Sequence, residues 1–209
     1  MYGTVLFDID TQNDFLLPVG ALSVPGAAKL IPTFARIYEL AQQRSIPVIA
    51  TVDAHTERDP EFAVWPPHCV ARTLGQAKVF GTLLADAVTV PNVANHLPLD
   101  HSPQSDAAQI IVEKQTVDMF QTVTLRDVLA SRPALRYAVF GVVTEICVLY
   151  AVRGLLASGK AVDVITDAIA SLDSQGKGQV ALDEMAAQGA RLITVADLAA
   201  SFDANLKHA

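Results

Sequence analysis

The chain has 209 residues, of which 51% are hydrophobic and 18% are charged, and its formal net charge is −7. A chain of this size can bury a full core, and we expect one domain over residues 1–209. Lysine and arginine form no basic stripe, which argues against a nucleic-acid partner. No apolar run reaches the ~20 residues that cross a bilayer, so we expect no membrane partner. Two cysteines make no disulfide framework, and the start of the chain lacks a basic leader, so we expect a cytoplasmic protein.

Short apolar runs alternate with amphipathic stretches, beginning with a strand pattern at residues 4–9 and a helical stripe at 27–44. The later strands are predicted at residues 46–52, 109–112, 136–140, 162–166 and 191–194. The later helices are predicted at residues 125–130, 148–157, 174–188 and 195–204. Alternation of this kind predicts the α/β class, as a three-layer α/β/α sandwich with a six-stranded, mostly parallel sheet.

Polar or reactive side chains follow four of the six predicted strands: Asp10, Asp53, Lys114 and Cys147. Ligands of parallel sheets bind beyond the carboxyl ends of the strands, so we expect these four side chains to converge at one edge. The irregular stretch that follows Asp53 is too long for a plain connection. We therefore expect an insertion around residues 53–106 to carry part of the function.

Cys147 lies where a predicted strand passes into a predicted helix, in the segment Gly-Val-Val-Thr-Glu-Ile-Cys at residues 141–147. Unpaired backbone N–H groups in the first turn of a helix lower the pKa of a thiol and can bind an oxyanion. The alternative interpretation is a small buried core residue, because free cysteine is often buried.

Asp10 and Lys114 could serve that thiol. A carboxylate can take the thiol proton and pass it to a departing amine, and a lysine can stabilise the thiolate. Taken singly, Asp10 could instead cap a helix or form a turn, and Lys114 could be a surface residue. Their joint position with Cys147 at strand ends favours a catalytic set.

A second group of polar residues follows the strand at 46–52: Asp53, His55, Glu61 and His68. Two imidazoles and two carboxylates can surround a divalent ion such as Zn²⁺, Fe²⁺ or Mn²⁺. Asp53 and His55 are two residues apart in an extended stretch and therefore project the same way. The alternative is a polar, solvated loop.

The chain resembles the nicotinamidase (pyrazinamidase) branch of the isochorismatase-like cysteine hydrolase family over essentially its whole length. The metal-loop motif points to this branch, because isochorismatases themselves lack it. The motifs that carry the resemblance are Asp10-Thr11-Gln12-Asn13-Asp14-Phe15, Asp53-Ala54-His55, Trp65-Pro66-Pro67-His68-Cys69-Val70, Glu113-Lys114 and Val143-Thr144-Glu145-Ile146-Cys147.

The resemblance implies a cysteine hydrolase with the isochorismatase-like fold. Cys147 would be the nucleophile, Asp10 the general base and acid, and Lys114 the third catalytic residue. The backbone N–H groups of Val143 and Cys147 would form the oxyanion hole, and the Val142–Val143 bond corresponds to a cis peptide in relatives.

The resemblance also implies one bound divalent metal ion, Zn²⁺ with Fe²⁺ or Mn²⁺ as alternatives, held by Asp53, His55 and His68. Some members place a glutamate seven positions before the last histidine. In this chain Glu61 occupies that position and would be the fourth ligand, with Asp59 or water as alternatives.

The implied reaction is deamidation of nicotinamide, or a related pyridine carboxamide, to the acid and ammonia through a thioester. Phe15 and Trp65 flank the predicted site and could sandwich a flat aromatic substrate. The alternatives are an amidohydrolase of carbamoyl or ureido compounds and a non-catalytic ligand-binding paralogue. Many relatives have Asp-His or Asp-x before the cysteine, where this chain has Glu145-Ile146. We expect a small-molecule substrate as the partner, and a homo-oligomer.

Overall fold

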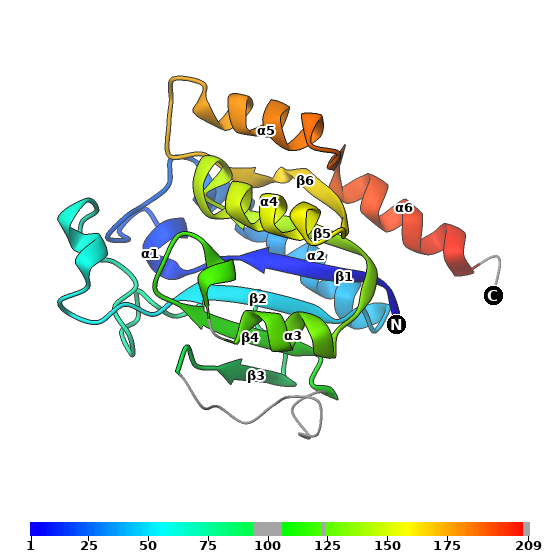
Figure 1. Ribbon diagram of the computed structural model, residues 1–209, viewed down its shortest axis with the longest axis horizontal. Coiled ribbons are helices and arrows are strands. Elements are labelled where there is room, and N and C mark those ends of the chain that lie inside the picture. Colours follow the sequence, from blue (N-terminus) through cyan, green and yellow to red (C-terminus); the bar gives the residue numbers. More distant parts are fainter. Residues whose placement is uncertain (94–105, 123, 207–209) are drawn as a thin grey trace.

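The computed structural model describes residues 1–93, 106–122 and 124–206. Of residues 204–206 it describes the backbone alone. Residues 94–105 of the predicted insertion therefore lie outside the described residues. Within the described part, a seven-stranded parallel sheet has the order β3-β4-β2-β1-β5-β6-β7 (Figure 1). The strands are β1 (Tyr2–Ile9), β2 (Val48–Asp53), β3 (Ala87–Val90), β4 (Gln109–Lys114), β5 (Ala134–Val142), β6 (Ala161–Ala170) and β7 (Arg191–Ile193).

The sheet corrects the prediction of six strands, because β3 lies inside the stretch that was predicted to be irregular. β3 is the edge strand beside β4, in register from Ala87 opposite Gln109 to Val90 opposite Val112. It has only four residues, of which Val90 alone is fully buried. Neither a long apolar run nor a strict alternation marks so short an edge strand in the sequence. Every strand pair is parallel, so the predicted orientation is confirmed.

Helices cover both faces of the sheet, as the alternating pattern predicts (Figure 1). Residues of α3, α4 and α5 pack on one face, and residues of α2 and α6 pack on the other. None of the described helices is long and apolar enough to cross a membrane. The helices are α1 (Asn13–Leu16), α2 (Ile31–Gln43), α3 (Leu125–Ser131), α4 (Leu149–Ala157), α5 (Lys177–Ala187) and α6 (Val195–Leu206).

The central strand β1 contributes alternate side chains to the two halves of the core. Val5, Phe7 and Ile9 pack with α3, α4 and α5, whereas Leu6 packs with α2 and α6. All four are completely buried, and burial of one such side chain stabilises the fold by about 1.5–3 kcal/mol. A central strand that is buried on both faces cannot move, so the residues that follow it are held in place.

The carboxyl ends of β2, β4, β1 and β5 meet at one edge of the sheet, as predicted. Ile9 is opposite both Thr51 of β2 and Gly141 of β5, and Asp53 is opposite Lys114. The predicted convergence of strand-end side chains is therefore confirmed.

The segment after β5 differs from the predicted α-helical first turn. It forms a π-helical turn, η6 (Thr144–Val148), and α4 begins only at Leu149. Single π turns are rare and occur often at functional sites. Cys147 lies in this wider turn.

Candidate active site

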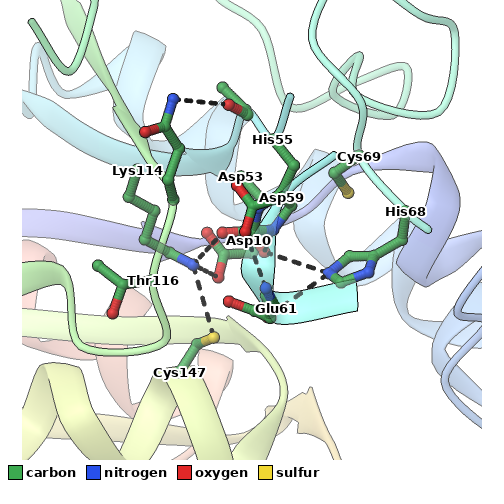
Figure 2. A network of polar contacts seen from close by, with 12 residues as sticks. Asp10, Asp53, His55, Asp59, Glu61, His68, Cys69, Lys114, Thr116 and Cys147 are labelled. Carbon is green, nitrogen blue, oxygen red and sulfur yellow. Dashed lines mark hydrogen bonds and ion pairs between the residues drawn. The ribbon is translucent and has the colours of Figure 1, made fainter. Parts of the chain in front are cut away.

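Asp10, Lys114 and Cys147 come together at the carboxyl edge of the sheet (Figure 2). Lys114 Nζ lies 2.9 Å from Asp10 Oδ2 and 3.6 Å from Cys147 Sγ. All three side chains are buried. A thiol beside an ammonium and a carboxylate is an arrangement that can support nucleophilic catalysis by cysteine.

Local backbone geometry directs the Asp10 carboxylate toward the other two groups. Asp10 has a positive φ of 53°, a conformation that aspartate tolerates better than most residues, so the chain turns sharply at the end of β1. Thr51 Oγ1 donates a 2.7 Å hydrogen bond to Asp10 Oδ1. Gly141, with φ 119°, allows β5 to approach closely, since a Cβ there would lie 2.0 Å from Ile9 O.

Lys114 remains charged in spite of its burial. Burial alone would lower the pKa of its ammonium, but the carboxylates of Asp10 and Asp53 raise that pKa well above its ordinary value. Lys114 Nζ also donates a 2.5 Å hydrogen bond to Asp53 Oδ1. The site therefore holds a fixed positive charge beside the Cys147 sulfur.

The surroundings of the Cys147 thiol favour its protonated form. Burial raises its pKa well above the ordinary value, Lys114 opposes that rise, and the carboxylates of Asp10 and Asp53 add to it. The predicted lowering of the thiol pKa by Lys114 is thus present, but burial outweighs it. Burial also raises the pKa of Asp10, against the lowering effect of Lys114. A carboxylate with a raised pKa is a stronger base, which suits it to accept the thiol proton.

The backbone around Cys147 has the features of an oxyanion site. The Val142–Val143 peptide bond is cis. Val143 O accepts hydrogen bonds from the N–H groups of Ile146 and Val148, on either side of Cys147 in the chain. In a regular α-helix, Val143 O would accept a hydrogen bond from the Cys147 N–H. Here Val143 O accepts from the residues immediately before and after Cys147.

Asp53, His55 and His68 form a compact group of metal-ligand atoms beside the catalytic set. One such atom from each residue lies within 4.8 Å of the others, and all three side chains are buried. Asp53 Oδ2 is 3.9 Å from His55 Nε2 and 3.9 Å from His68 Nε2. Both ring nitrogens of His55 are buried and lack a hydrogen bond of good geometry among the described residues, and Nε2 is the one that lies near Asp53 Oδ2. This donor set fits a divalent ion.

Both imidazoles are oriented by contacts to their other ring nitrogen. His55 Nδ1 lies 3.1 Å from Asp59 Oδ2, and His68 Nδ1 lies 2.8 Å from Pro66 O. Metal-binding histidines usually have such a partner, which fixes the tautomer and the direction of the free nitrogen. The Nε2 atoms of His55 and His68 therefore face the shared centre.

The two side chains considered as a fourth ligand, Glu61 and Asp59, lie on different sides of the histidines. Glu61 Oε1 is 3.9 Å from His68 Nε2, on the side of the metal-ligand atoms. Asp59 instead contacts the opposite nitrogen of His55. Burial raises the pKa of Asp59, but hydrogen bonding from the Glu61 N–H and from His55 lowers it below its ordinary value overall. Asp59 is therefore a charged group that orients His55.

Asp53 links the catalytic set to the metal-ligand group, a role that its position in the sequence does not reveal. Its Oδ1 binds Lys114 and its Oδ2 faces the two histidines. Gln12 holds the Asp53 backbone, because Asp53 N donates to Gln12 Oε1 at 2.7 Å and Gln12 Nε2 donates to Asp53 O at 2.8 Å.

Phe15 and Trp65, the residues predicted to bind substrate, line a small cavity of ≈20 Å³ beside Cys147. The Phe15 ring lies 5.3 Å from that of His68. Asp53, Glu61 and His68 line the same cavity, so the candidate metal ligands and the thiol share one space. The remaining lining residues are apolar: Leu22, Val117, Val142, Val143, Ile146 and Leu172.

Sequence reasoning missed several residues of the site. Gln12 lies in the motif at residues 10–15, and Thr51 lies two residues before Asp53, so their positions gave some signal. Leu172, which follows β6 in an irregular segment, gave none. Cys69 is buried and free, and its sulfur is 4.0 Å from Gly75 O.

Comparisons with known proteins agree with this geometry. A model of the isochorismatase domain family matches residues 4–197. The nicotinamidase of Escherichia coli is 29% identical, over 90% of this chain and 93% of its own length. The zinc complex of Pyrococcus horikoshii pyrazinamidase superposes with a TM-score of 0.73 at 26% identity, covering 91% of this chain and 98% of the other. A Streptococcus mutans pyrazinamidase/nicotinamidase gives a TM-score of 0.75 at 26% identity, covering 91% and 100%.

Proposed function

Because the chain belongs to the isochorismatase family of hydrolases, we propose that it is a metal-dependent amidohydrolase that deamidates nicotinamide or a close pyridine carboxamide. One observation carries this proposal: the thiol of Cys147 and the metal-ligand atoms of Asp53 and His68 line the same small cavity. A planar amide in that cavity can present its carbonyl carbon to the thiol and a ring nitrogen to a metal.

Cys147 attacks the carboxamide carbon, and Asp10 takes the proton that leaves the sulfur. The backbone N–H groups of Val143 and Cys147 stabilise the negative oxygen. Asp10 then gives the proton to the departing amino group, which leaves as ammonia, and a thioester remains. Water attacks the thioester, the carboxylic acid is released and the thiol re-forms, so each turnover consumes one water molecule.

Lys114 keeps a positive charge near the sulfur while the thiolate forms. Its contacts to Asp10 and Asp53 hold the ammonium between the two carboxylates. Asp53, His55 and His68, with Glu61 as the fourth ligand, would hold the divalent ion, with Zn²⁺ favoured over Fe²⁺ and Mn²⁺. The bound ion would supply a Lewis acid that orients the ring nitrogen of the substrate.

Apolar walls favour a neutral, flat substrate over an acidic one. Lys114 is the cation beside the thiol, and Asp10 and Asp53 already pair with it. Carbamoyl and ureido compounds that bear a carboxylate would therefore find no lysine or arginine among the residues that line the cavity. Phe15 and Trp65 offer instead the aromatic surface that a pyridine ring prefers.

Ammonia release from nicotinamide tests the proposal, with carbamoyl and ureido compounds as competing substrates and elemental analysis of the same preparation. We expect nicotinamide to have the highest kcat/KM and about one divalent ion to be bound per chain. Turnover of a carbamoyl or ureido compound in preference to nicotinamide would overturn the substrate. Full activity in metal-free protein would remove the metal from the mechanism.

A further inference from the structure

A second, wider groove adjoins the catalytic cavity. It has a volume of ≈610 Å³ and opens to solvent, compared with ≈20 Å³ for the catalytic cavity. Trp65, Ile146 and Leu172 line both spaces. These three side chains therefore form the wall between the catalytic cavity, which contains the thiol, and the wider groove.

The wall is assembled from three separate segments. Trp65 belongs to the loop that carries the metal ligands, Ile146 to the π turn before Cys147, and Leu172 to the segment between β6 and α5. All three are only partly buried, as expected for side chains with open space on two sides. The wall is thus one side chain thick.

Leu172 is held in the wall by a contact from the nucleophile turn. Glu145 Oε1, two residues before Cys147, accepts a 2.9 Å hydrogen bond from the N–H of Asp173. The Asp173 carboxylate in turn accepts from the N–H of Lys177 at the start of α5. These bonds fix the backbone next to Leu172 against both η6 and α5.

We propose that Leu172 is a specificity-determining residue that closes the catalytic cavity and limits the size of the amide that reaches Cys147. This inference rests on the proposed function. Removing the Leu172 side chain would join the two spaces and admit carboxamides whose ring carries a bulky substituent.

Leu172 is the wall residue that can be shortened without disturbing the chemistry. Ile146 is adjacent to Cys147, and its N–H donates to Val143 O within the nucleophile turn. Trp65 is tied to the metal loop through its N–H bond to Glu61 O. Leu172 lies in neither segment and packs on the core half formed by α2 and α6.

The charges around the wider groove indicate the chemical class of the substituent. Glu145, Asp173 and Glu184 line it with a single lysine, Lys177. An excess of carboxylates disfavours a negatively charged group, and Leu149 offers apolar surface. A neutral aryl group on the pyridine ring is therefore the substituent that the groove would accept.

The test compares the wild-type protein with Leu172→Ala and with Val180→Ala, a side chain that is 67% exposed and lines the outer groove alone. The substrates are nicotinamide and neutral nicotinamides that carry a phenyl group at each free ring carbon in turn. We expect Leu172→Ala to raise kcat/KM for at least one phenyl amide by about tenfold or more, because the pocket no longer excludes it. Val180→Ala should leave kcat/KM for each phenyl amide, relative to nicotinamide, unchanged. Glu145→Ala should raise this relative kcat/KM, as Leu172→Ala does.

A second measurement does not depend on which amide is the substrate. The alkylation rate of Cys147 by iodoacetamide is compared with that by its bulkier N-benzyl derivative. We expect the ratio of the N-benzyl alkylation rate to the iodoacetamide alkylation rate to be higher in Leu172→Ala than in the wild type. If both the substrate and the alkylation ratios match those of the wild type, Leu172 sets no size limit, and the proposed function is unaffected. If nicotinamide is not hydrolysed at all, the proposed function fails, and the alkylation ratio alone decides the role of Leu172.

Discussion

Asp8 and Asp10 lie two residues apart at the end of β1, and each is paired with a buried lysine. Lys78 Nζ is 2.8 Å from Asp8 Oδ2, and Lys114 Nζ is 2.9 Å from Asp10 Oδ2. The lysine side chains are 4% and 1% exposed, and both carboxylates are completely buried. By distance and burial alone the two ion pairs are the same.

The surroundings of the Asp8 pair are those of a structural contact. Asp8 Oδ2 also accepts hydrogen bonds from Thr11 Oγ1 at 2.9 Å and from Tyr38 Oη at 2.5 Å, and Lys78 donates to Thr11. Burial, followed by the negative charge of Asp8, raises the pKa of Tyr38 well above its usual value, so the hydroxyl stays a donor. The pair fastens the loop at Lys78 to β1 and α2.

The Asp10 pair differs in what lies beside it. Cys147 Sγ is 3.6 Å from Lys114, and the thiol lines a cavity that also contains metal-ligand atoms. Buried charge therefore does not identify a catalytic group in this protein. The proposed catalytic role of the Asp10 pair rests instead on the thiol and the cavity beside it, and the following variants test that distinction.

The largest expected effect is on the nucleophile. Cys147→Ala should lower kcat by about four orders of magnitude or more, because the other catalytic groups act only together with the thiol. Ammonia release measures the loss, and circular dichroism with thermal unfolding checks that the fold remains. Cys69→Ala is the matched control and should keep its activity. An alanine variant at position 147 with wild-type turnover would remove the thiol from the mechanism.

The next effect is on stability and concerns the other ion pair. Asp8→Ala leaves the Lys78 charge buried without its carboxylate, which should lower the free energy of unfolding by about 3–5 kcal/mol. Urea denaturation measures this loss. The double variant Asp8→Asn/Lys78→Met should recover part of it, since no buried charge remains. The kcat of the folded fraction should stay near that of the wild type. A large loss of kcat with unchanged stability would make the two ion pairs alike in function.

A smaller effect is expected on metal affinity. Asp59→Ala removes the carboxylate that orients His55, and loss of such a partner typically costs about 10–100-fold in affinity. Zn²⁺ titration against a competing chelator measures it. Glu57→Ala, which removes an exposed carboxylate two residues away, is the control and should bind as the wild type does. Equal affinities in both variants would mean that Asp59 does not support the site.

The smallest effect is a shift in the titration of the thiol. Lys114 opposes the rise in the pKa of Cys147 that burial causes, so Lys114→Ala should raise that pKa further. Alkylation by iodoacetamide follows the thiolate, so its pH profile should move to higher pH. A Cys147→Ser variant measures the background from Cys69. A profile in Lys114→Ala that coincides with that of the wild type would place the lysine outside electrostatic reach of the sulfur.

Hydrophobic patterning was sufficient to predict the fold class and the edge at which the site lies. The runs at residues 4–9, 46–52 and 109–112 are apolar on both faces, and such runs require a sheet covered on both sides. The polar residues that follow them must then meet at the carboxyl edge. β3 escaped prediction because an edge strand of four residues is stabilised by its pairing with β4 and carries little pattern of its own.

The sequence by itself determined which residue types stand at the strand ends, and the motifs around Asp10, Asp53 and Cys147 determined the family. The tertiary structure decided how those groups divide their work. Asp53 contacts Lys114 with Oδ1 and faces the histidines with Oδ2. Asp59 contacts His55 at Nδ1, the ring nitrogen opposite the one that faces Asp53. Burial also raises the pKa of the Cys147 thiol, and Leu172 lies between the catalytic cavity and the wider groove. These properties depend on distances and exclusion of water between segments far apart in the chain, and no local pattern of residues encodes them.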